Sequence, residues 1–203
     1  MREVSGPQRA RINTRRGTVT KVIRRNSTCF GVWFGAEFDG PFIEGSRLTG
    51  RIAPTKVDPD VAKLQEPARG MRFSVMVDRV EPMERFSFRW HPFAIDPNYD
   101  YSKEPTTLVV FELREADGGV LLTITESGFG QIPAARRAQA LESNDKGWAH
   151  QTKLIEKFLL VKNSFGLSDA GTECSSGAIA QCGNGLCCAR RPGTLGDHCA
   201  ALR

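Results

Sequence analysis

Apolar and polar side chains alternate along the middle of the chain in a way that predicts β-strands. In residues 71–78 most apolar side chains share one face and the polar ones share the other, and residues 86–90 repeat this alternation with three aromatic residues. Two further apolar runs, 106–113 and 120–125, flank the sequence Ala116-Asp117-Gly118-Gly119, and an Asp-Gly pair in this position is a strong hairpin signal. These four segments predict consecutive antiparallel strands.

After Pro133 the apolar spacing becomes that of a helix. Residues 134–141 are rich in strong helix formers, and Asn144 or Asp145 is a candidate cap for a longer helix that runs to Leu160. Four side chains on that helix follow each other at intervals of four, three and four residues: Trp148, Thr152, Ile155 and Leu159.

A sheet with one apolar face and a helix with one apolar stripe bury both surfaces by packing against each other. We therefore expect an α+β fold, in which a curved antiparallel sheet surrounds a long C-terminal helix. The space between the sheet and the helix is then the natural site of an apolar ligand.

The two ends of the chain lack this periodicity. Residues 1–29 form a basic arm that we expect to be irregular, or at best to hold one edge strand around Val19, Val22 and Ile23. Residues 161–203 hold five of the six cysteines and no sustained apolar pattern, so we expect a disordered tail. The sequence therefore predicts three parts, with one domain at residues 30–160.

The net charge of +5 and the isoelectric point near 9.0 belong to the arm and not to the domain. Residues 1–29 carry eight basic side chains against one acidic, whereas residues 30–160 carry sixteen basic and nineteen acidic ones. Because the arm lacks interleaved aromatic residues, we predict no specific nucleic-acid partner. No apolar run is long enough to span a bilayer, no secretory signal is recognisable, and the domain has no cysteine framework, which together favour a cytoplasmic location.

The residue types that carry chemistry do not assemble into a recognisable catalytic or metal centre. The three histidines have no spacing that supports a nucleophile–base–carboxylate triad, and the tail cysteines lack the paired C-x-x-C spacing of zinc sites. We therefore predict no metal and no cofactor. Glu126 is the most interesting polar residue, because a carboxylate facing the cavity would hold the polar end of a ligand or act as a base. A solvated glutamate at a strand end is the commoner arrangement.

Five short motifs resemble one known superfamily. They are WFG at residues 33–35, FSFRWHP at 86–92, TTLVVFEL at 106–113, LLTITESGF at 121–129 and NDKGW at 144–148. Together they resemble the SRPBCC (START-like, Bet v 1-like) superfamily, in the branch of homologues of the activator of the heat-shock protein 90 ATPase. Residues 1–29 show none of the first strand and short helix of that family, and the tail matches nothing in it. We interpret both flanks as products of a fusion or of a change of reading frame.

The resemblance implies a helix-grip fold with an internal hydrophobic cavity, and relatives of bacterial type that bind lipids, hydrophobic small molecules or proteins. From it we predict a non-catalytic domain that binds a hydrophobic small molecule or lipid between the sheet and the C-terminal helix. Two alternatives stay open. One is a protein-interaction module related to the co-chaperone relatives, with a chaperone or another protein as its partner, and the other is an enzyme with Glu126 or His91 as the base. The predicted cavity lining consists of Trp33, Phe73, Phe86, Phe88, Trp90, Phe111, Glu126, Trp148 and Ile155.

Overall fold

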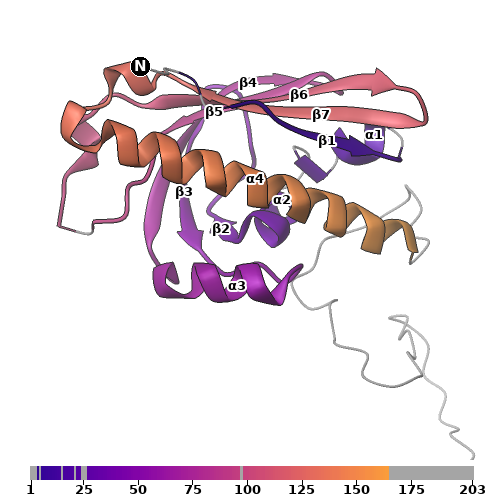
Figure 1. The fold of residues 1–203 in the computed structure, drawn as a ribbon, viewed down its shortest axis with the longest axis horizontal. Helices are drawn as coiled ribbons and strands as arrows, with labels where there is room; N and C mark the ends of the chain where they lie inside the picture. Colours follow the sequence, from indigo (N-terminus) through magenta and orange to yellow (C-terminus); the bar gives the residue numbers. More distant parts are fainter. Residues whose placement is uncertain are drawn as a thin grey trace, which may run out of the picture.

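The chain forms one antiparallel sheet that a long helix crosses (Figure 1). The computed structural model describes residue 4 and residues 6–14, 16–20, 22–23, 27–96 and 98–164. The spatial order of the strands is β1-β7-β6-β5-β4-β3-β2. They are β1 (Gln8–Ile12), β2 (Ala36–Phe38), β3 (Arg47–Ile52), β4 (Arg72–Glu81), β5 (Arg85–Trp90), β6 (Thr107–Ala116) and β7 (Gly119–Ser127). This arrangement confirms the expected α+β, helix-grip architecture.

The helix that crosses the sheet is α4 (Ala134–Ser164), and its predicted stripe faces the strands. Trp148, Ile155 and Leu159 are at most 2% exposed, and Thr152 is 6% exposed. The predicted cap at Asn144 or Asp145 is wrong, because α4 runs through both residues without a break. The side chain of Asn144 points to a buried carboxylate of the sheet and does not cap a backbone N–H group.

The N-terminal residues are part of the fold, so the expectation of an irregular arm is wrong for those that the structure describes. Strand β1 pairs with β7 along its whole length, and its two apolar side chains, Ala10 and Ile12, are buried. The predicted edge strand was placed too late in the chain, because Val19 lies on the short helix α1 (Arg16–Thr20). The tail beyond residue 164, which we expected to be disordered, lies outside the described residues.

Helix α2 (Ser27–Phe34) inserts aromatic side chains between α4 and the sheet. The ring of Phe30 lies within 6.4 Å, centroid to centroid, of seven other aromatic rings on α2, on the strands and on the β2–β3 connection. Helix α3 (Pro59–Gln65) packs near the end of α2, where the Gln65 side chain donates to the carbonyl oxygen of Phe34 and accepts from the N–H of Thr55. Gly35 ends α2 with a φ of +86°, a left-handed conformation that favours glycine.

Candidate functional site

The predicted cavity residues come together in the core between the sheet and the helices. Seven of them are at most 3% exposed, namely Trp33, Phe86, Phe88, Phe111, Glu126, Trp148 and Ile155. Around the rings of Phe30, Phe34 and Phe88 the described side chains leave no room for a water molecule. The structure therefore brings the predicted lining residues together, but their role in holding a ligand stays a prediction.

Glu126 lies on β7 in the middle of this core, where it is fully buried. One carboxylate oxygen, Oε1, accepts from Trp90 Nε1 at 2.7 Å, from Thr107 Oγ1 at 2.5 Å and from Asn144 Nδ2 at 3.1 Å. The other, Oε2, accepts from Trp148 Nε1 at 2.6 Å and from Asn144 Nδ2 at 3.0 Å. The donors to this buried carboxylate lie on β5, β6 and α4, so Glu126 joins these three elements to its own strand, β7.

This network explains why the sequence motifs occur together. Trp90 belongs to the motif at 86–92, Thr107 to the one at 106–113, and Glu126 to the one at 121–129, while Asn144 and Trp148 are the first and last residues of the motif at 144–148. Four motifs thus meet at one carboxylate. From the sequence, Glu126 was expected to bind a ligand, to act as a base or to be solvated, and its buried structural role was missed because the four donors are dispersed along the chain.

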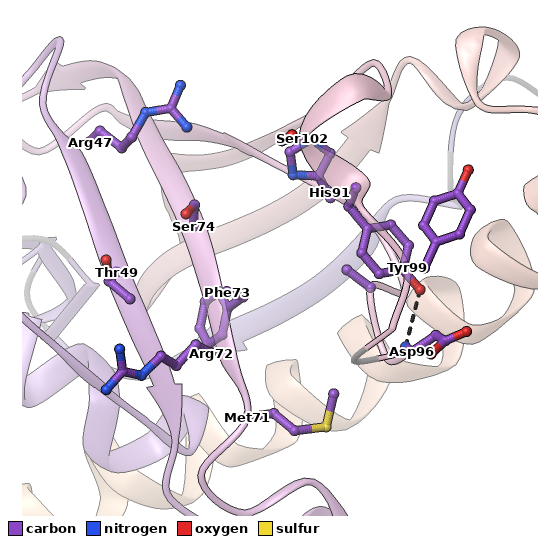
Figure 2. A pocket seen from close by; sticks show the side chains of 12 residues that line it. Arg47, Thr49, Met71, Arg72, Phe73, Ser74, His91, Asp96, Tyr99 and Ser102 are labelled. Atoms are coloured by element: carbon purple, nitrogen blue, oxygen red, sulfur yellow. Dashed lines mark hydrogen bonds between the residues drawn. The ribbon is translucent and has the colours of Figure 1, made fainter.

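An open pocket of about 430 Å³ lies outside this core, beside the first residues of β4. Strand β5 ends at Trp90, which pairs with Val75, so residues 72–74 of β4 have no neighbour on that side. There the chain leaves the sheet at His91 and returns at Thr107. Figure 2 shows the resulting opening, with β3 and β4 on one side and the connection between β5 and β6 on the other. We call this connection, residues 91–106, the β5–β6 loop.

The β5–β6 loop is fixed to α4 through Arg136. Its guanidinium group donates to Glu104 Oε2 from Nε at 2.7 Å and to the carbonyl oxygen of Pro92 from Nη1 at 3.0 Å, and it lies 4.8 Å from the ring centre of Tyr101. The side chains of Glu104 and Arg136 are only 5% and 16% exposed. The hydrogen bonds from Arg136 hold the pKa of Glu104 below its usual value, although burial opposes this shift. The β5–β6 loop, which forms one wall of the pocket, is therefore anchored to α4 by charge-assisted hydrogen bonds.

The floor of the pocket is apolar and continues into the core. Phe73 lines the pocket and also packs against Trp90 and Phe38, with ring centres 6.2 and 5.8 Å apart. Its ring lies over Gly50 on β3, where an added Cβ atom would come within 2.3 Å of the ring. Glycine at this position therefore leaves space for the aromatic floor.

The rim of the pocket is polar. Arg47 and Thr49 on β3 and Arg72 and Ser74 on β4 project from the outward face of the sheet, the face turned away from α4, and the β5–β6 loop contributes further polar groups. His91, the alternative base in the sequence analysis, lines the pocket, with Nε2 3.2 Å from the carbonyl oxygen of Glu104. The other rim residues were missed. For the rim residues of the β5–β6 loop, the signal in the sequence is the accumulation of proline and tyrosine at 92–105.

Among the described residues, the histidine, cysteine, aspartate and glutamate side chains form no group of three that would hold a metal ion. None of the helices formed by these residues combines the length and the apolar character that a membrane span requires.

The comparisons with known proteins agree with the fold. The family description "Activator of Hsp90 ATPase homolog 1-like protein" matches residues 52–159, just over half of the chain. A comparison with the curated proteins found no significant match.

Among solved structures, protein MLL2253 from Mesorhizobium loti is similar with a TM-score of 0.56 and 18% identity, over 77% of this chain and 97% of that one. Protein Ms6760 from Mycobacterium smegmatis has a TM-score of 0.55 and 17% identity, over 77% of this chain and 90% of its own. A protein from Arthrobacter aurescens, solved by NMR, has a TM-score of 0.57 and 12% identity, over 86% and 91%. At these identities the likeness establishes the fold alone.

Proposed function

The chain belongs to the family of activator of Hsp90 ATPase homolog 1-like proteins, and we propose that it is a non-catalytic START-like domain that binds a small molecule with an apolar body in the pocket beside β4. The family and the fold support a ligand-binding START-like domain in general. Our proposal goes further, because it names a hydrophobic ligand and the pocket in which that ligand binds.

The observation that carries the proposal is the contrast between the closely packed rings around Phe30 and the open pocket. Sites for small molecules in proteins have volumes of about 300–1,000 Å³ and apolar walls with a few polar groups. The pocket has about 430 Å³, with Phe73, Met71 and the two tyrosines of the β5–β6 loop among its lining. The core around Phe30 offers no such space among the described side chains. We therefore propose that the ligand lies at the edge of the sheet and that only its apolar end contacts Phe73.

The size of the pocket sets the expected affinity. A two-ring aromatic molecule buries roughly 150–200 Å² of apolar surface, which corresponds to a gross gain of about 4–5 kcal/mol at ~25 cal/mol per Å². Association costs several kcal/mol, so apolar contact alone would give weak binding, with dissociation constants of about 1 mM or higher. Tighter binding requires polar groups of the rim.

The proposal is tested by filling the pocket. We expect 2-naphthyl probes to bind the full-length chain saturably, measured by the change in probe fluorescence, and we expect Ser74→Trp to abolish this binding. Thr123→Trp is the matched control, because Thr123 faces outward on β7, far along the sheet from the pocket. Circular dichroism verifies that both variants fold. Absence of saturable binding to the wild type, or equal binding to both variants, would contradict the proposal.

The enzyme alternative keeps only one of its two candidate bases. Glu126 is fully buried and both of its oxygens accept hydrogen bonds from side chains of the core, so a substrate in the pocket does not reach it. His91 lines the pocket and remains the residue to replace if the purified protein shows turnover.

A further inference from the structure

We propose that the ligand of this pocket is an organic anion, that Arg47 and Arg72 bind its charged group on the outward face of the sheet, and that its apolar body passes round the unpaired edge of β4 to contact Phe73. This inference rests on the proposed function, because it names the chemical class of the molecule that occupies the same pocket. It adds a specificity that neither the family nor the fold implies.

The first observation is that both arginines of the rim lack a partner. Arg47 and Arg72 line the pocket, and their guanidinium groups make neither a hydrogen bond nor an ion pair with any described residue. Their neighbours differ. Arg51 pairs with Arg72 across the β3–β4 ladder, and its Nη2 atom lies 2.8 Å from Glu37 Oε2. Arg89 lies in the same row across the sheet as Arg47, and its Nε atom lies 3.8 Å from Asp78 Oδ1. The cations that border the pocket are therefore the ones available to a ligand.

The second observation is that two hydroxyl groups lie between the two arginines. Thr49 and Ser74 are directly opposite each other on β3 and β4, and each arginine is two residues from this pair, in opposite directions along the strands. Two residues of a strand span about 7 Å, a distance that an arginine side chain covers. Both guanidinium groups can therefore reach an anion that lies at the Thr49–Ser74 pair. Figure 2 shows Arg47 extending from β3 toward the side of the pocket that the β5–β6 loop forms.

A third polar group faces the same space from the loop. The hydroxyl group of Tyr101 accepts a hydrogen bond from the N–H of Asp96 at 3.1 Å, so its own hydrogen is left to donate. Asp96 is the only acidic residue among those that line the pocket, and its carboxylate accepts from the N–H of Asn98 at 2.9 Å. The balance of charge is thus positive, and the free polar groups are mainly donors.

This set of groups selects an anion over a neutral or cationic molecule of the same shape. Guanidinium groups bind carboxylates and phosphates through two parallel N–H donors, and such charge-assisted bonds are about twice as strong as neutral ones. An anion without an apolar body would leave Phe73 uncovered. The class that fits is an aromatic or alkyl carboxylate or phosphate monoester, and the two head groups are distinguished by experiment.

The test compares three probes that share one apolar body, namely naphthalene-2-carboxylate, 2-naphthyl phosphate and the neutral 2-naphthalenemethanol. We expect at least one anion to bind the full-length chain about tenfold tighter than the alcohol, or more. The double variant Arg47→Gln/Arg72→Gln should remove this difference and leave the affinity for the alcohol unchanged. The matched control is Arg51→Gln/Arg89→Gln, which removes the same charge from the same face and should keep the preference.

The outcomes separate the inference from the proposed function. If the alcohol and the anions bind equally and Ser74→Trp abolishes all binding, the pocket is a ligand site but the anion specificity is wrong. If the control variant loses the preference as much as the Arg47/Arg72 variant, the attraction is a general effect of surface charge and the inference is overturned. If no probe binds to the wild type, both proposals fail. The ranking of carboxylate and phosphate identifies the head group.

Discussion

Replacement of Glu126 by glutamine tests the role of the buried carboxylate. Glutamine keeps the shape of the side chain and exchanges one acceptor oxygen for an NH₂ donor. Trp90 donates to one oxygen of Glu126 and Trp148 donates to the other. Whichever way the amide is oriented, it therefore presents its NH₂ group to one of the two indole N–H groups. The hydroxyl of Thr107 and the amide of Asn144 can turn to accept, whereas an indole nitrogen can only donate.

The expected cost follows from these contacts. A buried donor without an acceptor costs about 1–3 kcal/mol, and the hydrogen bonds that remain become neutral ones, which contribute about 1 kcal/mol each instead of about 1.5–3. We expect Glu126→Gln to lower the free energy of unfolding by about 3 kcal/mol or more. Against a typical total of about 5–15 kcal/mol, this is a large share.

The assay is equilibrium unfolding in urea, followed by tryptophan fluorescence and by circular dichroism. Glu142→Gln serves as the control, because Glu142 is an exposed residue of α4 whose ion pair with Lys146 lies at the surface, so its unfolding curve should hardly move. If Glu126→Gln unfolds at the same urea concentration as the wild type, the structural role is refuted. If stability is unchanged and probe binding is lost, Glu126 serves the ligand and not the fold.

Three other changes give expected outcomes. Arg136→Met should lower the free energy of unfolding by about 3 kcal/mol at neutral pH, because it leaves Glu104 buried without its partner. Since Arg136 holds the pKa of Glu104 below the ordinary 4.5, the ion pair stabilises the fold above that value, and this contribution is lost as the pH falls through the lowered pKa. The acid-induced loss of stability below about pH 4.5 should therefore be shallower in Arg136→Met than in the wild type. An unchanged pH profile would show that the pKa of Glu104 does not depend on Arg136. Gly50→Ala should displace the ring of Phe73 and weaken probe binding, whereas Gly147→Ala, which has open space around it, should leave binding intact, and equal binding to both would show that the floor does not contact the probe. Asp58→Ala should increase amide hydrogen exchange at the start of α3 more than Asp58→Asn, because asparagine keeps the cap on the N–H groups of Asp60 and Val61, and equal exchange would exclude the capping role.

The sequence predicted the parts of the fold in which periodicity is long. Strands β4 to β7 and the stripe on α4 each repeat over enough residues for one face to be recognised, and their packing follows from the need to bury both faces. Strand β1 was missed because only Ala10 and Ile12 mark its inner face, and the positions around them are polar. Its place in the sheet depends on pairing with β7, which lies more than a hundred residues away.

The site was only partly predictable for the same reason. The aromatic residues were recognised as a group, but whether a group of rings leaves a cavity depends on packing, and around Phe30, Phe34 and Phe42 the described side chains leave no room for a water molecule. The pocket beside β4 arises because β5 ends opposite Val75 and leaves the first three residues of β4 unpaired on that side, a mismatch in strand length that no local pattern reveals. Two residues that line this pocket were named from the sequence, Phe73 as part of the predicted cavity lining and His91 as an alternative base.

The place of the ligand is tested most directly by NMR titration of the uniformly ¹⁵N-labelled chain with naphthalene-2-carboxylate. We expect saturable shifts of the amide signals of Thr49, Ser74 and Ser102, which surround the pocket, and unchanged signals for Leu154 and Ile155 in the buried stripe of α4. Saturable shifts centred on Leu154 and Ile155, with the three pocket signals unmoved, would place the ligand between the sheet and α4 and contradict the assignment of the pocket.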